Sequence, residues 1–202
     1  MNTTTPVPGR RAKPAAPCTS RRRWLAGLLG LTLLVGTGPG LAQGGSAPKF
    51  SEYEVKAAFL LNFLQFVEWP AAATTNDGTP LTICVLGDYP FGAALDETIK
   101  GETIQGRPLT IRRVHQVAEV KSCALVFICR SEKPRLKDTI QALRGCGALT
   151  VSDVDQFCQC GGMIGLVNEG GRIRFEINQE AADQGNVKIS SKLLRLARLT
   201  HR

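Results

Sequence analysis

The stretch between residues 80 and 153 constrains the fold most strongly, because it alternates β-rich apolar runs with segments of helical pattern. The apolar runs are LTICVLG (81–87), RPLTIRRV (107–114), CALVFIC (123–129) and GALTVSD (147–153). The segments expected to be helical are 90–101, 115–122 and 132–145. Strands that alternate with helices at this pitch predict βαβ units, and therefore an α/β fold: a three-layer α/β/α domain with a largely parallel sheet.

The flanking segments predict a helix before this region and a hairpin and a helix after it. Ser51 and Glu54 form a capping-box pattern, so a helix is expected to start at Ser51 and to end before Pro70. The residues expected to face the core recur at helical spacing and are Val55, Phe59, Phe63 and Phe66, with Ala58 and Leu61 nearby. The segment 162–178 reads as a β-hairpin. The segment 190–199, SSKLLRLARL, reads as an amphipathic helix whose inward residues are Leu193, Leu194, Leu196 and Ala197.

The N-terminus has the pattern of an export signal. Residues 1–23 contain six basic residues and no acid, and a 12-residue apolar run follows from Trp24 to Val35. That run suits a signal peptide better than a membrane span, which needs ~20 residues. We expect cleavage after Ala42, by the general secretory or, given Ser20-Arg21-Arg22, the twin-arginine route; a retained membrane anchor is the alternative. The chain then divides into a signal peptide (1–42), a flexible lead-in (43–50) and a single domain (51–202).

The formal net charge of +8 gives a misleading picture of the exported chain. Without the leader, 19 basic and 17 acidic residues remain, so the high pI gives no reason to expect nucleic-acid binding. The remaining basic concentration near the C-terminus consists of Lys188, Lys192, Arg195, Arg198 and Arg202. We expect a solvated helix face there; the alternative is a docking surface for an acidic partner or for anionic lipid headgroups.

Six cysteines remain after cleavage: Cys84, Cys123, Cys129, Cys146, Cys158 and Cys160. An even number in an exported chain favours disulfides. The spacing Cys158-x-Cys160 is not that of a zinc site, and the chain has only His115 and His201 as histidines. We therefore expect structural disulfides and no metal, with connectivity left open.

The sequence contains few signals of catalysis. It lacks the G-x-S-x-G, H-E-x-x-H, G-x-x-x-x-G-K-[ST] and G-x-G-x-x-G motifs, so we expect neither an enzyme nor a cofactor. The candidate ligand or partner surface comprises Trp69, Asp88, Pro90 and Phe91. Asp88 follows the first strand, where parallel sheets open a ligand crevice, but it could equally cap the next helix. Trp69 could equally cover the core.

Six blocks of the chain resemble, in order, those of the YfiR family. They are EVKAAFLLNFLQFVEWP, ICVLGDYPFG, GRPLTIRRV, LTVSDVDQFCQCGGMIGLV, GRIRFEINQEAA and ISSKLLRLARL, and the likeness runs from Glu52 to Leu199. The resemblance implies a periplasmic α/β protein. It also implies binding to the periplasmic sensor region of a membrane-anchored diguanylate cyclase, which lowers cyclic-di-GMP production and restrains biofilm formation. The resemblance further implies that an outer-membrane lipoprotein and the redox state of the family disulfides govern release of the cyclase from this repression.

The resemblance also suggests how some of the cysteines are used. Cys84 and Cys123 correspond to a family disulfide. Cys158 occupies the first position of a second family bridge, but the other position is filled by a non-cysteine residue near Gly165. Cys158 and Cys160 are too close to pair with each other, so we expect one of them to pair with Cys146 or Cys129.

The function expected is therefore that of a periplasmic regulatory protein that acts by binding a partner. A second copy of the chain, in a homodimer, is a further candidate partner. The alternative is a small-ligand sensor that uses the crevice around Asp88.

Overall fold

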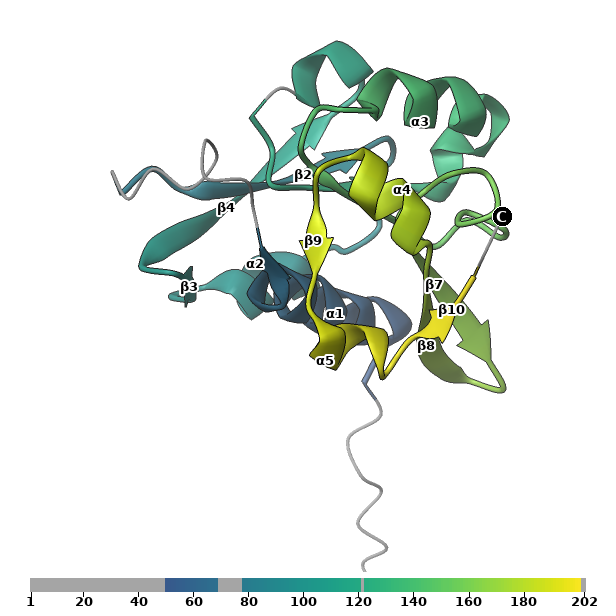
Figure 1. Ribbon diagram of the computed structural model, residues 1–202. Helices are drawn as coiled ribbons and strands as arrows, with labels where there is room; N and C mark the ends of the chain where they lie inside the picture. The colour runs from purple at the N-terminus through teal and green to yellow at the C-terminus, as the bar shows by residue number, and fades with distance from the viewer. Residues whose placement is uncertain (1–49, 69–77, 121, 201–202) are drawn as a thin grey trace, which may run out of the picture. The chain divides into compact units, whose positions relative to one another are not determined.

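A mostly parallel sheet forms the centre of the computed structural model, which describes residues 50–68, 78–120 and 122–200 (Figure 1). Within these residues the sheet has eight strands in the order β10-β8-β7-β6-β5-β2-β4-β3, and β1 pairs separately with β9. The strands are β1 (Val67–Glu68), β2 (Leu81–Leu86), β3 (Thr103–Ile104), β4 (Arg107–Val114), β5 (Leu125–Ile128), β6 (Leu149–Ser152), β7 (Ile164–Glu169), β8 (Arg172–Ile177), β9 (Lys188–Ile189) and β10 (Arg198–Leu199). The helices are α1 (Glu52–Gln65), α2 (Ala94–Ile99), α3 (Leu136–Leu143), α4 (Gln179–Gln184) and α5 (Ser191–Leu194), with 3-10 turns η2 (Val117–Val120) and η3 (Arg130–Arg135).

The chain order of the parallel strands reverses at β2. β2 pairs in parallel with β4 on one side and with β5 on the other, and β6 and β7 then follow outward from β5. The chain therefore winds first one way and then the other from β2, which creates a topological switch point between β2 and β5. The predicted α/β class and largely parallel sheet are confirmed.

Two apolar cores lie on opposite faces of the sheet. In β2, Ile83 and Val85 pack in the core that includes α1 and α2, whereas Cys84 and Leu86 pack in the core that includes α3. This division follows because successive strand side chains point to opposite faces. The three-layer α/β/α arrangement predicted from sequence is confirmed.

Helix α1 begins as predicted but presents a different face. Ser51 and Glu54 form the capping box. The buried residues are Lys56, Ala57, Leu60, Phe63 and Leu64, while Ala58 is exposed and Val55 only half-buried. The predicted stripe was therefore partly wrong, because the sheet-facing side includes a lysine that periodicity analysis excludes.

The C-terminal helix predicted over 190–199 is present but is much shorter than predicted. Helix α5 spans only Ser191–Leu194, Leu196 is 76% exposed, and Arg198–Leu199 pair in parallel with β8. The edge of β8 offers backbone partners, and the Thr200 N–H donates to the Ile177 carbonyl at 3.0 Å. Pairing with this edge takes the place of further helical turns after α5. The basic residues between 188 and 198 therefore lie in β9, α5, a connecting turn and β10, and not on one helix face.

The helix expected over 90–101 is shorter than predicted. Helix α2 starts at Ala94, its N-cap is Ala93, and no side chain caps it. Asp88 is therefore not the cap of this helix. The strands β1, β3 and β9 and helix α4 have no counterpart in the sequence predictions, because each spans only two to six residues.

Several sequence predictions lie outside the described residues. These are the signal peptide and its cleavage at Ala42, nearly all of the lead-in, Trp69, Pro70, His201 and Arg202. Among the helices that are described, none combines the length and the apolar character that a membrane crossing requires.

Candidate functional site

The loops at the carboxyl ends of β2, β5 and β6 form the candidate site, because ligand sites of doubly wound folds lie at this edge. Asp88 follows β2 and is exposed, and its backbone N–H donates to Ser131 Oγ at 2.9 Å. Gly87 has φ +100°, and a Cβ there would lie 2.4 Å from Ser131 Oγ. The chain after β5 thus approaches the chain after β2 so closely that only glycine fits at position 87.

The other predicted surface residues are placed differently. Phe91 is only 3% exposed and packs edge-to-face on Phe127, with ring centroids 4.9 Å apart. It also contacts Tyr53 and Tyr89. Phe91 is therefore a core residue and not part of an exposed surface, whereas Pro90 is half-buried.

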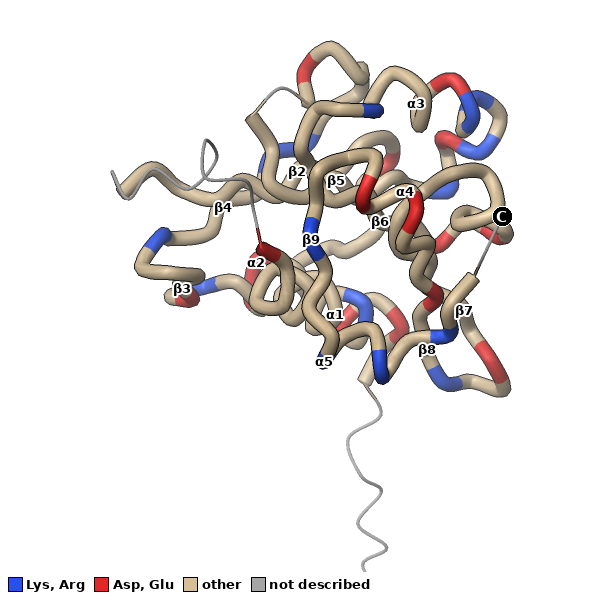
Figure 2. Tube along the Cα trace, viewed as in Figure 1, with Lys and Arg blue, Asp and Glu red and all other residues tan. Residues whose placement is uncertain are grey.

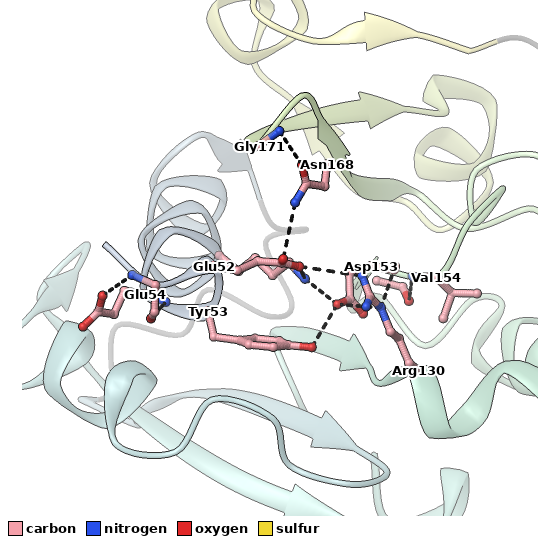
Figure 3. Close-up of polar contacts among 11 residues, drawn as sticks. Glu52, Tyr53, Glu54, Arg130, Asp153, Val154, Asn168 and Gly171 are labelled. Carbon is pink, nitrogen blue, oxygen red and sulfur yellow. Dashed lines mark hydrogen bonds and ion pairs between the residues drawn. The ribbon is translucent and has the colours of Figure 1, made fainter. Parts of the chain in front are cut away.

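A cluster of charged and polar side chains lies beside this edge, and we call it the Asp153 cluster (Figure 3). Its members are Glu52, Tyr53, Lys56, Arg130, Asp153 and Asn168. Lys56 reaches from α1 to Asp153 just after β6, with Nζ 2.5 Å from Oδ2, and the side chains of both are 1% exposed. The Tyr53 hydroxyl and Arg130 Nε also reach Oδ2, each at 3.2 Å.

Glu52 extends the cluster toward solvent. It forms an ion pair with Lys56 and accepts a hydrogen bond from Asn168 Nδ2 at 3.4 Å. The hydrogen bond with Lys56 is the main reason that the pKa of Glu52 is lowered, although partial burial opposes the effect. Burial, and next the negative charge of Asp153, raises the pKa of Tyr53 to about 12.

The geometry gives the Asp153 cluster a structural role. Two cations and two anions are present. Oδ2 of Asp153 accepts hydrogen bonds from Lys56 and Tyr53 and forms an ion pair with Arg130, so each buried charge has a counter-charge. Asp153 Oδ1 alone is buried without a hydrogen-bond partner among the described residues. The sequence analysis did not predict that Lys56 is buried. The available signal was its position on α1, where it shares a face with the buried residues Leu60 and Phe63.

The disulfide implied by the family resemblance is present. Cys84 and Cys123 are bonded, with Cα atoms 5.9 Å apart. The Nη2 of Arg112, which aligns with Cys84 across β2 and β4, lies 3.2 Å from Cys123 Sγ and 3.6 Å from Cys84 Sγ. No cluster of three or more histidine, cysteine or acidic side chains suited to a metal occurs among the described residues.

The other four cysteines of the described residues are free thiols: Cys129, Cys146, Cys158 and Cys160. The expected pairing of Cys158 or Cys160 with Cys146 or Cys129 is therefore not seen. Cys129 belongs to the core on the α1 face, whereas Cys160 packs against the core on the α3 face, so the sheet separates them. Burial raises the pKa of Cys129 to about 12 and that of Cys158 to about 11, which keeps both protonated and unreactive.

The resemblance predicts that a non-cysteine residue near Gly165 fills the second position of a family bridge, and Cys158 is a free thiol. A Cβ at Gly165 would lie 3.4 Å from Cys158 Sγ. The thiol thus faces the place where a second cysteine would stand, and the side chain there is missing.

The fold defines a doubly wound α/β domain whose carboxyl edge is occupied by its own polar contacts. Residues 53–198 match the YfiR/HmsC-like family, and the chain belongs to that family. Its members are periplasmic regulatory proteins, and this membership supports the same class and location for the chain.

Two solved structures are similar to this chain at low levels. A conserved domain protein from Vibrio cholerae O1 biovar El Tor strain N16961 has a TM-score of 0.49 and 14% identity over 76% of this chain and 61% of its own. The ABC domain of Streptococcus pneumoniae in complex with L-Trp has a TM-score of 0.43 and 11% identity over 59% of this chain and 55% of its own. The chain spans less than two thirds of either protein, and similarities this low carry no inference about fold or ligand.

Replacing Lys56 with methionine should destabilise the fold by about 3–5 kcal/mol, because it leaves Asp153 buried without its closest cation. The double variant Lys56→Met, Asp153→Leu should lose less than the sum of the single losses. Lys133→Met is the matched control, since its ion pair with Asp155 is exposed and worth ~0–1 kcal/mol. Urea unfolding measures the wild type, the single variants Lys56→Met and Asp153→Leu, the double variant and the control; strictly additive losses would show that Lys56 and Asp153 are not coupled.

The two tyrosines should ionise near pH 12, and neither should ionise near 10, the ordinary value. Asp153→Asn should lower the pKa of Tyr53 alone, because it removes a nearby negative charge, and Asp96→Asn should do the same for Tyr89. Phenolate absorbance against pH measures both, with circular dichroism to verify folding. Two tyrosines titrating near 10 in the folded wild type would contradict the placement of these hydroxyls.

Gly165→Cys should form a disulfide with Cys158 under oxidising conditions, given the 3.4 Å approach. Closing this short loop should stabilise the fold by about 2 kcal/mol in the chain-entropy model. Mass spectrometry of a non-reduced digest identifies the bond. Gly165→Ser controls for the added side chain; two free thiols after oxidation would be the contrary result.

Proposed function

We propose that this protein binds the periplasmic sensor region of a membrane-anchored diguanylate cyclase and represses the enzyme, which lowers cyclic-di-GMP signalling. Membership of the YfiR/HmsC-like family carries the proposal, because the match covers residues 53–198 and so includes nearly every described element. The signal peptide expected over residues 1–42 would deliver the chain to the compartment where that sensor region lies.

The carboxyl edge of the sheet is consistent with a regulator. In doubly wound enzymes this edge supplies polar side chains to a substrate. In this protein Asp153 is engaged by Lys56, Tyr53 and Arg130, and Ser131 closes over Gly87. These polar groups stabilise the scaffold. We therefore assign the binding of a partner to the outer surface of the domain.

We further propose that the Cys84–Cys123 bond makes this repression dependent on redox conditions. The bond links β2 to the loop before β5, next to the switch point, and reduction would free these two segments from each other. Cys84 is fully buried and Cys123 is 6% exposed, so a small dithiol is a more suitable reductant than a large protein.

A small-ligand sensor is the alternative function, and the exposed carboxylate of Asp88 at the switch point is the observation in its favour. It has less support, because the close contact between Gly87 and Ser131 fills the adjoining space with protein atoms.

The test is binding between the purified mature protein and the periplasmic domain of a diguanylate cyclase encoded beside it. Isothermal titration should show saturable binding of the oxidised protein, and its addition should lower the activity of the full-length cyclase in membranes. The double variant Cys84→Ser, Cys123→Ser separates the effect of the disulfide from other effects of reductant. Absence of binding in both the oxidised and the reduced state would refute the proposal.

A further inference from the structure

A groove near the C-terminus lies between α1, the β7–β8 hairpin and the chain that leads into β10. We call it the C-terminal groove; its volume is about 350 Å³. Its lining includes Phe59, Glu169, Arg174, Phe175, Leu196 and Arg198. Its walls thus come from three segments that are distant in sequence but adjacent in the fold (Figure 1).

The groove is apolar at its base and has an unusual apolar side chain at its rim. Phe59 packs on Phe175 with ring centroids 5.5 Å apart; both rings line the groove, and we call this pair its base. Leu196 is 76% exposed and Leu199 is 47% exposed. Among the described residues Phe50 is the only other exposed large apolar side chain, so two of the three lie in this short segment. Exposed apolar side chains concentrated beside a groove are typical of protein interaction sites.

The charges of the segment that leads into the groove favour an acidic occupant. Arg174 and Arg198 are both paired with Glu169, at 3.2 and 2.9 Å, so the polar groups of the wall satisfy one another. Lys192 and Arg195, in contrast, make no ion pair within the described residues, and the segment 188–200 contains four basic residues and no acid (Figure 2). These two cations are available to carboxylates of a partner.

The neighbouring strand edge favours an extended occupant. Within the described part of the chain, β10 is the outermost strand on its side of the sheet, and it pairs only with β8. In a parallel pair alternate backbone groups point away from the neighbour, so β10 can accept a further strand.

We infer that the C-terminal groove is the docking surface for an extended, acidic segment of the cyclase sensor region, with apolar side chains seated against Phe59 and Leu196. This inference rests on the proposed function. It assigns carboxylates of the segment to Lys192 and Arg195, and it places the backbone of the segment along β10.

The variant Leu196→Glu tests this surface, because it adds a negative charge where an acidic segment would dock. Its affinity for the periplasmic domain of the cyclase should fall about tenfold or more relative to wild type. Gln141→Glu is the matched control: it makes a neutral exposed residue on α3 acidic, and affinity should not change. The double variant Lys192→Gln, Arg195→Gln should weaken binding and reduce its dependence on salt. All four substituted positions are exposed, so all variants should keep the melting temperature of the wild type.

The outcomes separate the two proposals. If the wild type binds the cyclase domain and Leu196→Glu binds equally well, the inference about the groove is wrong and the proposed function stands. If the wild type does not bind in either redox state, both are wrong. If Leu196→Glu leaves cyclase binding intact but converts a dimer into a monomer in sedimentation experiments, the occupant is a second copy of this chain and the inference is overturned.

Discussion

The ion pair between Lys56 and Asp153 is the contact on which the arrangement of the domain depends. It joins α1 to the end of β6 across 97 positions of sequence, with both side chains 1% exposed. Removing two charges from water is costly, and the pair is tolerable because Tyr53 and Arg130 also reach the carboxylate and Glu52 also reaches the ammonium. Once α1 is held there, its apolar face covers one side of the sheet and its Phe59 forms the base of the C-terminal groove.

This contact also determines how the carboxyl edge of the sheet is used. The fold brings polar side chains to the position where doubly wound proteins bind ligands. In this protein those side chains bind one another and hold elements of the domain together. The disulfide has a comparable effect on the opposite face, where it joins β2 to the segment that precedes β5. A scaffold fixed in this way suits a protein that acts by presenting a surface, as expected of a member of this regulatory family.

Sequence reasoning was accurate where periodicity was strong and failed where distant partners decided the outcome. The strands β2, β4, β5 and β6 and the hairpin were predicted, because apolar runs bounded by turns leave little choice. Lys56 was not predicted to be buried, since its burial depends on an aspartate far away in the sequence. The C-terminal helix was predicted too long, because the leucine spacing suits a helix throughout the segment, whereas the edge of β8 offers backbone partners to its last residues. The pairing of Cys84 with Cys123 came from the family resemblance and not from spacing.

The disulfide and the groove lie on opposite sides of a single layer of strands. Cys84 points into the core beneath α3, while its neighbours Ile83 and Val85 point toward α1, the helix that carries the base of the groove. Reduction of the disulfide therefore cannot alter the proposed docking surface by direct contact. Under the proposed redox control, an effect of reduction on the groove would have to pass through the backbone of β2. It would change how firmly the two helical layers are held to one another.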